Sequence, residues 1–223
     1  MILARLPASM TYVARITICK IAIVLTLCAG LAQAAPLKLV AIGDSLTHGY
    51  GLAPEDGFVP QLERWLKAQG RDVAVINMGV SGDTTEGGRA RLDWALGDGA
   101  DAVIVALGGN DLLRGIDPDR SEANLDAMLS ELAAKSIPVL LAGMQAPLNY
   151  GPEFKEAFDA MYPKLAKAHD AILYPSFLDG LVSESGTAAD LMQSDGIHPN
   201  ATGVRLMVES IGPKVLELLD RAK

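Results

Sequence analysis

Short apolar runs alternate along this chain with segments whose apolar residues recur at helical spacing, and this alternation most restricts the possible folds. A continuous apolar run predicts a strand buried on both faces, which is typical of a parallel sheet covered by helices on each side. We therefore predict an α/β chain, a three-layer α/β/α sandwich around a flavodoxin-like parallel sheet. The expected strands are 37–42, 73–76, 102–107, 139–142 and 171–174, and the expected helices are 58–66, 84–96, 125–132, 154–168 and 204–218.

The first 34 residues differ in composition from the rest of the chain. They contain three basic residues and no Asp or Glu, then an uncharged apolar run at 21–31, and they end in Ala32-Gln33-Ala34. A basic start, a short apolar core and a small-residue exit are typical of a secretory signal peptide. We predict cleavage after Ala34, which leaves a single domain of residues 35–223 in a periplasmic or secreted protein.

Other interpretations of this leader stay open. A membrane anchor needs about 20 apolar residues, whereas this run has 11, so no stable membrane anchor is expected. A lipoprotein cleavage site at Cys28 would follow the bulky Leu27, where such sites usually carry a small residue. Residues 10–34 alone make a complete signal, so Met10 is an alternative start to Met1.

The charge balance is acidic. The chain has 19 Lys and Arg against 27 Asp and Glu, and because three of the basic residues lie in the leader, residues 35–223 carry a net charge of −11. Nucleic acids and anionic membranes bind through clustered Lys and Arg, so neither is expected as a partner.

Both cysteines, Cys19 and Cys28, lie in the leader. Residues 35–223 therefore have no disulfide, no thiol nucleophile and no cysteine metal site. The chain has only three histidines, His48, His169 and His198, which argues against a multi-histidine metal site.

Polar motifs follow the predicted strands where ligands meet a parallel sheet, at the carboxyl ends. The first three strands end in Gly43-Asp44-Ser45-Leu46, in 77–83 (NMGVSGD) and in 108–111 (GGND). A fourth motif, 195–199 (DGIHP), lies in the segment 175–200, which has little periodicity and predicts a long loop. Long loops in a compact domain are often functional, so these four motifs define the candidate site.

These motifs contain the parts of a serine nucleophile site. Ser45 is the candidate nucleophile, His198 the candidate base, and Asp195 is close enough in sequence for a turn to bring its carboxylate to the imidazole. His48 lies only three residues after the serine, and His169 ends a helix away from the strand ends. Candidate donors to a developing oxyanion are the N–H groups of Ser45 and Gly82 and the side-chain amide of Asn110.

Each motif alone also has a purely structural interpretation. Gly-Asp-Ser after a strand is often a turn with a helix N-cap, Gly-Gly-Asn is often a loop with positive φ, and Asp-x-x-His is often a surface turn. Their joint occurrence, in this order and at these strand ends, favours the catalytic interpretation. The Gly-x-Ser-x-Gly elbow of α/β-hydrolases does not occur, so that fold is disfavoured.

The chain resembles the SGNH, or GDSL, hydrolases from about Leu37 to the closing helix. Ser45, Gly82, Asn110 and His198 match the four residues that name the family, with Asp195 in the usual D-x-x-H position. Within the family it is similar to the periplasmic thioesterase I, lysophospholipase and arylesterase group. The motifs that carry this closer similarity are 81–84 (SGDT), 108–115, 149–151 (NYG), 162–166 (YPKLA) and 195–199.

The resemblance implies a serine esterase that hydrolyses carboxylic esters and thioesters through an acyl-enzyme, with no metal or organic cofactor. Its partner would be a small-molecule acyl ester or thioester, and the protein is expected to be a monomer. The loop from Leu112 to Ile116 would border the acyl site. The other wall would be 145–150, with Gln145, Pro147 and Tyr150.

Two alternatives stay open at this point. One is a carbohydrate O-acetylesterase of the same family, which an appended sugar-binding module would favour. The other is a non-catalytic flavodoxin-like binding protein, which would need no Ser-His-Asp set.

Overall fold

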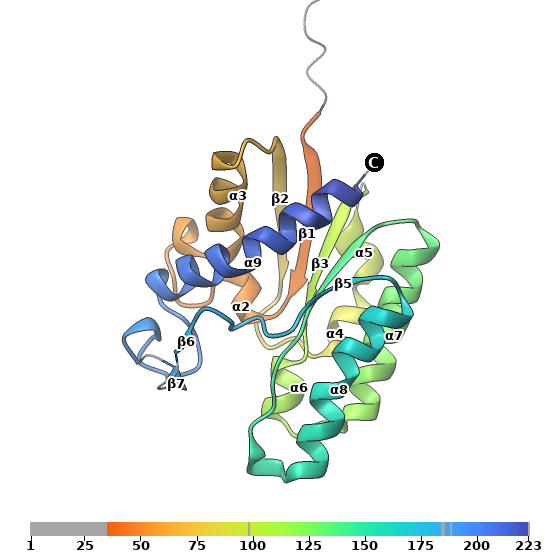
Figure 1. The fold of residues 1–223 in the computed structure, drawn as a ribbon, viewed down its shortest axis with the longest axis vertical. Helices are drawn as coiled ribbons and strands as arrows, with labels where there is room; N and C mark the ends of the chain where they lie inside the picture. Colours follow the sequence, from red (N-terminus) through yellow and green to blue (C-terminus); the bar gives the residue numbers. More distant parts are fainter. Residues whose placement is uncertain (1–34, 98, 184–185, 188, 223) are drawn as a thin grey trace, which may run out of the picture. The chain divides into compact units, whose positions relative to one another are not determined.

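Five parallel strands form one sheet in the computed structural model, which describes residues 35–97, 99–183, 186–187 and 189–222 (Figure 1). The strand order is β2-β1-β3-β4-β5, which is the flavodoxin-like order, so the predicted fold is confirmed. The predicted leader, 1–34, lies outside the described residues. The strands are β1 (Leu37–Gly43), β2 (Val73–Gly79), β3 (Ala102–Ala106), β4 (Val139–Ala142) and β5 (Ile172–Tyr174).

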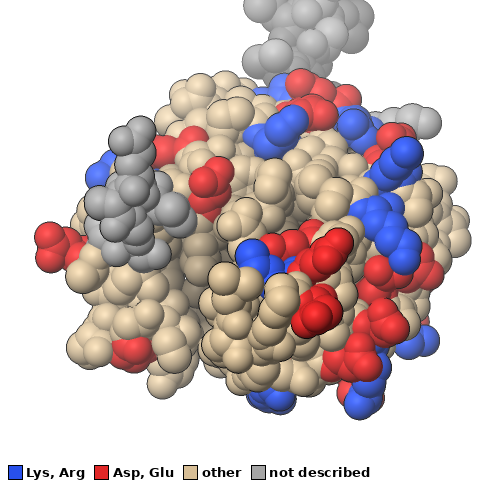
Figure 2. Space-filling view, turned by 60° about the horizontal axis from the view of Figure 1, so that its bottom comes forward, with Lys and Arg blue, Asp and Glu red and all other residues tan. Residues whose placement is uncertain are grey.

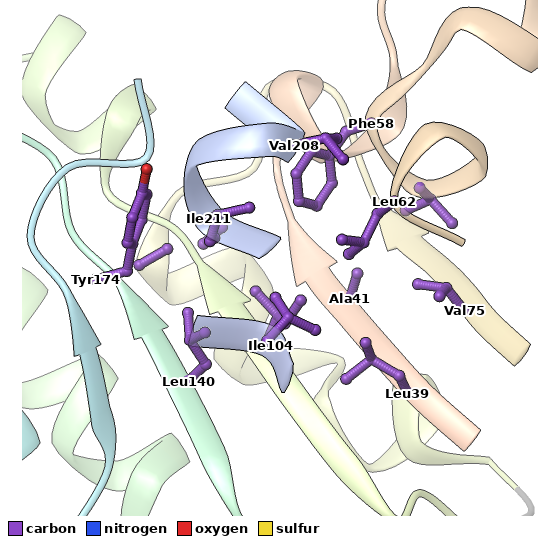
Figure 3. Close-up of a cluster of buried hydrophobic side chains, with 14 of the residues drawn as sticks. Leu39, Ala41, Phe58, Leu62, Val75, Ile104, Leu140, Tyr174, Val208 and Ile211 are labelled. Carbon is purple, nitrogen blue, oxygen red and sulfur yellow. The ribbon is translucent and has the colours of Figure 1, made fainter. Parts of the chain in front are cut away.

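Helices cover both faces of this sheet, because successive strand side chains point to opposite faces. On one face Leu39 and Ile104 belong to an apolar cluster with α3 and α9 (Figure 3). On the other face Val40 and Val105 belong to a second cluster with α5, α7 and α8. These helices are α3 (Phe58–Ala68), α5 (Leu92–Leu96), α7 (Pro118–Ala134), α8 (Pro152–Ala168) and α9 (Ala201–Arg221).

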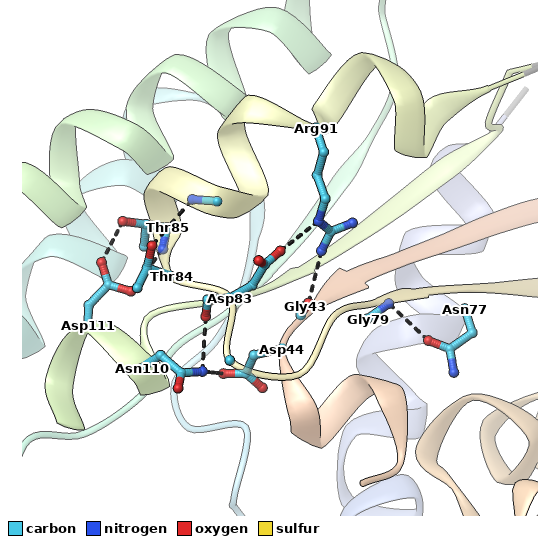
Figure 4. Close-up of polar contacts among 12 residues, drawn as sticks. Gly43, Asp44, Asn77, Gly79, Asp83, Thr84, Thr85, Arg91, Asn110 and Asp111 are labelled. Atoms are coloured by element: carbon cyan, nitrogen blue, oxygen red, sulfur yellow. Dashed lines mark hydrogen bonds and ion pairs between the residues drawn. The ribbon is translucent and has the colours of Figure 1, made fainter. Parts of the chain in front are cut away.

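The prediction of one helix over 84–96 is wrong, because two short helices, α4 (Thr85–Ala90) and α5, divide at Arg91. The Arg91 guanidinium donates to Asp83 Oδ2 at 2.6 Å and to the Gly43 carbonyl at 3.1 Å (Figure 4). These bonds turn the side chain toward the end of β1, and the Arg91 backbone leaves the helical region, with φ −113° and ψ 13°.

The segment 175–200 is not the wholly irregular loop that its sequence predicts. It contains the antiparallel pair β6 (Val182–Ser183) and β7 (Gly186–Thr187), and the short helix η3 (Ala189–Leu191). Elements of two or three residues are too short to give a detectable hydrophobic period, so the sequence could not reveal them.

Short helices follow the strands at the carboxyl edge of the sheet, the lower edge in Figure 1. After β1 come α2 (Ser45–His48) and η1 (Pro54–Asp56), α6 (Gly109–Leu113) follows β3, and η2 (Leu148–Tyr150) follows β4. The strand order reverses between β1 and β3, where doubly wound sheets bind ligands. In the part of the chain that the structure describes, no helix has the length and apolar character of a membrane span.

Candidate active site

The candidate nucleophile Ser45 is the first residue of α2, directly after β1. Asp44 caps this helix, since its Oδ1 accepts the Leu46 N–H at 3.0 Å. The turn from strand to helix is tight: a Cβ at Gly43 would lie 2.0 Å from Thr47 Oγ1. Glycine at this position therefore allows Ser45 to sit at the edge of the sheet.

His198 and Asp195 lie in one turn before α9. Asp195 Oδ1 accepts the N–H groups of Ile197 at 2.9 Å and His198 at 3.0 Å, and Oδ2 lies 2.7 Å from His198 Nδ1. The hydrogen bond from the His198 N–H, with those from the imidazole and the Ile197 N–H, lowers the pKa of Asp195 to about 2. His198 Nε2 lies 2.8 Å from Ser45 Oγ, so carboxylate, imidazole and hydroxyl form one hydrogen-bonded series.

The other two histidines occupy different environments. His48 Nδ1 lies 3.2 Å from Ser81 Oγ. His169 follows the C-terminal end of α8, and its Nε2 lies 2.7 Å from Asp126 Oδ1 in α7. Neither is bonded to Ser45. The geometry therefore favours His198 as the partner of the serine, as the sequence predicts.

The three candidate oxyanion donors come from three neighbouring strands. Ser45 follows β1, Gly82 follows β2 with a φ of +87°, and Asn110 lies in α6 after β3. Arg114 donates to the Gly82 carbonyl at 2.8 Å, which fixes the peptide beyond that glycine. Among the described residues, no acceptor takes the N–H of Ser45 or of Gly82.

The Asn110 amide is held by its neighbours in the orientation that Figure 4 shows. Its Nδ2 donates to the Asp83 carbonyl at 3.0 Å and lies 3.4 Å from Asp44 Oδ2. The second contact is long for an N–H···O bond. That N–H is therefore the one that can turn to a substrate oxygen.

Asp44 is a site residue that sequence reasoning missed. Its side chain is 3% exposed, and burial, opposed in part by the Leu46 N–H and by His198, raises its pKa to about 6. A Cβ at Gly109 would lie 3.0 Å from Asp44 Oδ2, so the chain is shaped around this carboxylate. The sequence signal was only a carboxylate between a buried strand and Ser45.

We expect Asp44→Asn to raise the free energy of unfolding at pH 7 by up to about 3 kcal/mol, because a neutral amide avoids the burial penalty of the carboxylate. The pKa is about 6 in the folded chain against a reference value of 3.8, so the folded state binds the extra proton between these pH values. The contribution of Asp44 to the free energy of unfolding of the wild type therefore falls as the pH rises from 3.8 to about 6. Denaturant unfolding at about pH 4 and pH 7.5 measures the difference, which should vanish at the lower pH. Equal stabilities at the higher pH would contradict this expectation.

A cavity of about 1050 Å³ opens beside Ser45 and His198, and the space-filling view of this edge in Figure 2 shows a hollow between uncharged surfaces. Of the predicted substrate-binding residues, Leu112 and Gln145 line it. The opposite wall of the cavity is formed by the segment between β5 and α9, and not by the segment after β4 that the sequence predicts. The side chains of that wall include Leu178, Leu181, Met192 and Ile197.

The other three predicted substrate-binding residues, Ile116, Pro147 and Tyr150, do not line the cavity. The Tyr150 hydroxyl donates to the Leu113 carbonyl at 3.3 Å, and its ring packs against Phe154 with centroids 5.0 Å apart. Tyr150 thus supports the α6 segment from outside. The prediction of a wall over 145–150 is corrected to Gln145 with its neighbour Met144.

Comparison with known proteins gives a consistent set of similarities. Residues 41–206 match the GDSL-like Lipase/Acylhydrolase family. Esterase TesA of Pseudomonas aeruginosa is 39% identical over 188 residues, covering 84% of this chain and 92% of that protein. Thioesterase 1/protease 1/lysophospholipase L1 of Escherichia coli K12 is 39% identical over 169 residues, covering 75% and 77%. The crystal structure of AlinE4, an SGNH-hydrolase family esterase, superposes with a TM-score of 0.70 at 40% identity, covering 84% of this chain and 99% of AlinE4.

Proposed function

The chain belongs to the GDSL-like lipase/acylhydrolase family and is a carboxylic ester or thioester hydrolase, and on this premise we propose that Ser45, His198 and Asp195 are its catalytic triad. The observation that best supports the proposal is the chain of hydrogen bonds from Asp195 through His198 to Ser45, the last two of which line the cavity. An alkoxide nucleophile needs a base within hydrogen-bond reach and a group that orients the base.

In the proposed reaction His198 Nε2 takes the Ser45 proton as Ser45 Oγ attacks the acyl carbonyl carbon. The oxyanion that forms accepts hydrogen bonds from the Ser45 and Gly82 N–H groups and from the Asn110 amide. The imidazolium then gives its proton to the departing alcohol or thiol, which leaves an acyl-enzyme. Water, deprotonated by His198, attacks this ester and releases the acid and free Ser45.

Asp195 has an orienting and electrostatic part in this proposal. Its Oδ2 accepts from Nδ1, which leaves Nε2 of the neutral imidazole free to accept the Ser45 proton. Because its pKa is low, Asp195 is ionised at neutral pH, and its negative charge stabilises the positive charge that the imidazole gains during the reaction. Its own carboxylate is fixed by two backbone N–H groups, so the turn sets the imidazole direction.

Labelling with a fluorophosphonate tests the proposed nucleophile directly. We expect stoichiometric labelling of Ser45 with loss of esterase activity, and no label in Ser45→Ala. The same reagent tests the non-catalytic alternative, since a binding protein without an activated serine would stay unlabelled. A label on any other serine would overturn the assignment.

We expect broad acceptance of small acyl substrates, because apolar side chains such as Leu112 line the cavity together with the flexible, unbranched side chains of Met144 and Met192. Rates should be measured on p-nitrophenyl esters of graded length, an acyl-CoA, a lysophospholipid and an acetylated sugar. The last substrate tests the carbohydrate O-acetylesterase alternative. A preference above roughly a hundredfold for one of these, well beyond what one methylene gives, would contradict the expectation.

We also propose that residues 1–34 are a signal peptide and that the enzyme acts in the periplasm or outside the cell. The support is the sequence pattern ending in Ala32-Gln33-Ala34. Mass spectrometry of the exported protein should find Ala35 at the N-terminus. A mature protein that still contains 21–31 would contradict the proposal.

A further inference from the structure

The serine and the histidine of the proposed triad lie 153 residues apart in sequence, so the short contact between them depends on how two separate segments are joined. Ser45 belongs to a short helix at the end of β1. His198 belongs to a turn in a segment with little regular structure. A further contact between the two segments is needed to hold this turn against α2 and to keep His198 Nε2 within hydrogen-bonding distance of Ser45 Oγ.

Gln193 makes the hydrogen bonds that join these two segments. Within the turn, its N–H donates to the His198 carbonyl at 2.7 Å and its carbonyl accepts from Gly196 at 3.0 Å. Its side-chain Nε2 donates to the Pro199 carbonyl at 3.0 Å and, across to the other segment, to the Tyr50 carbonyl at 2.8 Å. One side chain thus spans the turn and ties it to the residues after α2.

Tyr50 completes the connection to the nucleophile. Its N–H donates to the Ser45 carbonyl at 3.1 Å, so the bonded path runs from Ser45 through Tyr50 to Gln193 and on to His198. Its ring lies against the imidazole, with centroids 4.8 Å apart and planes tilted by 40°. This contact restricts the imidazole on one face.

The neighbouring glycine leaves room for the Gln193 side chain. Gly51 has a φ of +75°, and a Cβ there would lie 2.3 Å from Gln193 Oε1. A side chain at Gly51 would therefore displace the amide that bonds to the Tyr50 carbonyl. A substitution at Gly51 would therefore disturb the hydrogen bond from Gln193 to the Tyr50 carbonyl without changing Gln193 itself.

We propose that Gln193 and Tyr50 are positioning residues, which hold the His198 imidazole over Ser45 through the hydrogen bond between the Gln193 amide and the Tyr50 carbonyl and through the Tyr50 ring. The inference rests on the proposed triad. A displacement of about 1 Å between reacting groups can reduce the rate by about 10²-fold. Loss of the hydrogen bond between Gln193 and Tyr50 should therefore lower mainly kcat.

The test compares four variants in purified enzyme on a soluble p-nitrophenyl ester. Gln193→Ala and Gln193→Glu should each lower kcat by about 10- to 100-fold with KM changed less than about threefold, since neither side chain can donate to the two carbonyls. Tyr50→Ala should lower kcat by about tenfold. Tyr50→Phe should keep wild-type kcat, because it retains both the ring and the carbonyl. Fluorophosphonate inactivation should slow in parallel with kcat.

Gln145→Ala is the matched comparison for how the effect of Gln193→Ala divides between kcat and KM, because Gln145 is a glutamine that lines the same cavity from the opposite wall. If Gln193 only contacted substrate, Gln193→Ala would raise KM with kcat retained, and that result would overturn the inference. Should Gln193→Ala fail to fold by circular dichroism, Gly51→Ala must show the kcat loss instead, and wild-type kcat there would overturn it. Ser45→Ala is measured alongside: activity in that variant contradicts the triad, whereas an inactive Ser45→Ala with wild-type kcat in Gln193→Ala contradicts the positioning inference alone.

Discussion

Ser45→Ala and His198→Ala should each reduce kcat by on the order of 10⁴-fold or more, and the double variant should be little worse than either single variant. The reason is that the serine has no useful nucleophilicity without a base, and the base has no function without the serine. The two side chains meet at 2.8 Å and act as one unit, so removing either removes the same step. Asp195→Ala should lower kcat less, since Asp195 orients the imidazole and takes no proton.

The measurement is a kinetic comparison of the three single variants and the double, each checked for folding by circular dichroism. The Asp195 variant has a further consequence, because its carboxylate also caps the N–H groups of Ile197 and His198. Asp195→Asn, which keeps one oxygen for these bonds, separates loss of the turn from loss of charge. A Ser45→Ala enzyme with about a tenth of wild-type activity, or losses that multiply in the double variant, would refute the triad.

The central part of the site was predictable because it depends on topology. Parallel strands that alternate with helices bring their carboxyl ends to one edge, so motifs that follow β1, β2 and β3 must lie near one another. Asp195 and His198 are three residues apart, which lets a single turn pair them. Local sequence and strand order were therefore sufficient for these residues.

The surroundings of the proposed triad were not predictable in the same way. The Gln193 side chain donates to the carbonyl groups of Tyr50 and Pro199. A sequence does not show which backbone carbonyls accept such bonds. The cavity wall at Leu178 and Leu181 comes from a segment without a hydrophobic period. The family resemblance implied a wall over 145–150 that included Tyr150, whereas the direction of its ring depends on packing against Phe154, which only the folded chain determines.

Asn110→Ala should lower kcat by on the order of 10²–10³-fold, about 3–4 kcal/mol of transition-state stabilisation, with a smaller change in KM. The amide is positioned before substrate arrives, since the bond from Nδ2 to the Asp83 carbonyl at 3.0 Å fixes its direction. The remaining N–H has only the long contact to Asp44, so it can strengthen its bond as negative charge develops on the carbonyl oxygen. A donor of this kind stabilises the transition state more than the bound ester, and kcat therefore carries the loss.

A matched control distinguishes this role from a structural one. Asn124 is also an asparagine whose Nδ2 donates within the fold, to Thr85 Oγ1 at 3.2 Å, but it lies outside the cavity lining. Asn124 Oδ1 also accepts from the exposed Arg89 guanidinium at 3.3 Å. Asn124→Ala should therefore lower the free energy of unfolding by about 1–2 kcal/mol and leave kcat unchanged, as expected for the loss of two hydrogen bonds remote from the cavity. If Asn110→Ala behaved like Asn124→Ala, with lower stability and wild-type kcat, the Asn110 amide would serve only to hold the Asp83 carbonyl. The oxyanion would then depend on the Ser45 and Gly82 N–H groups alone.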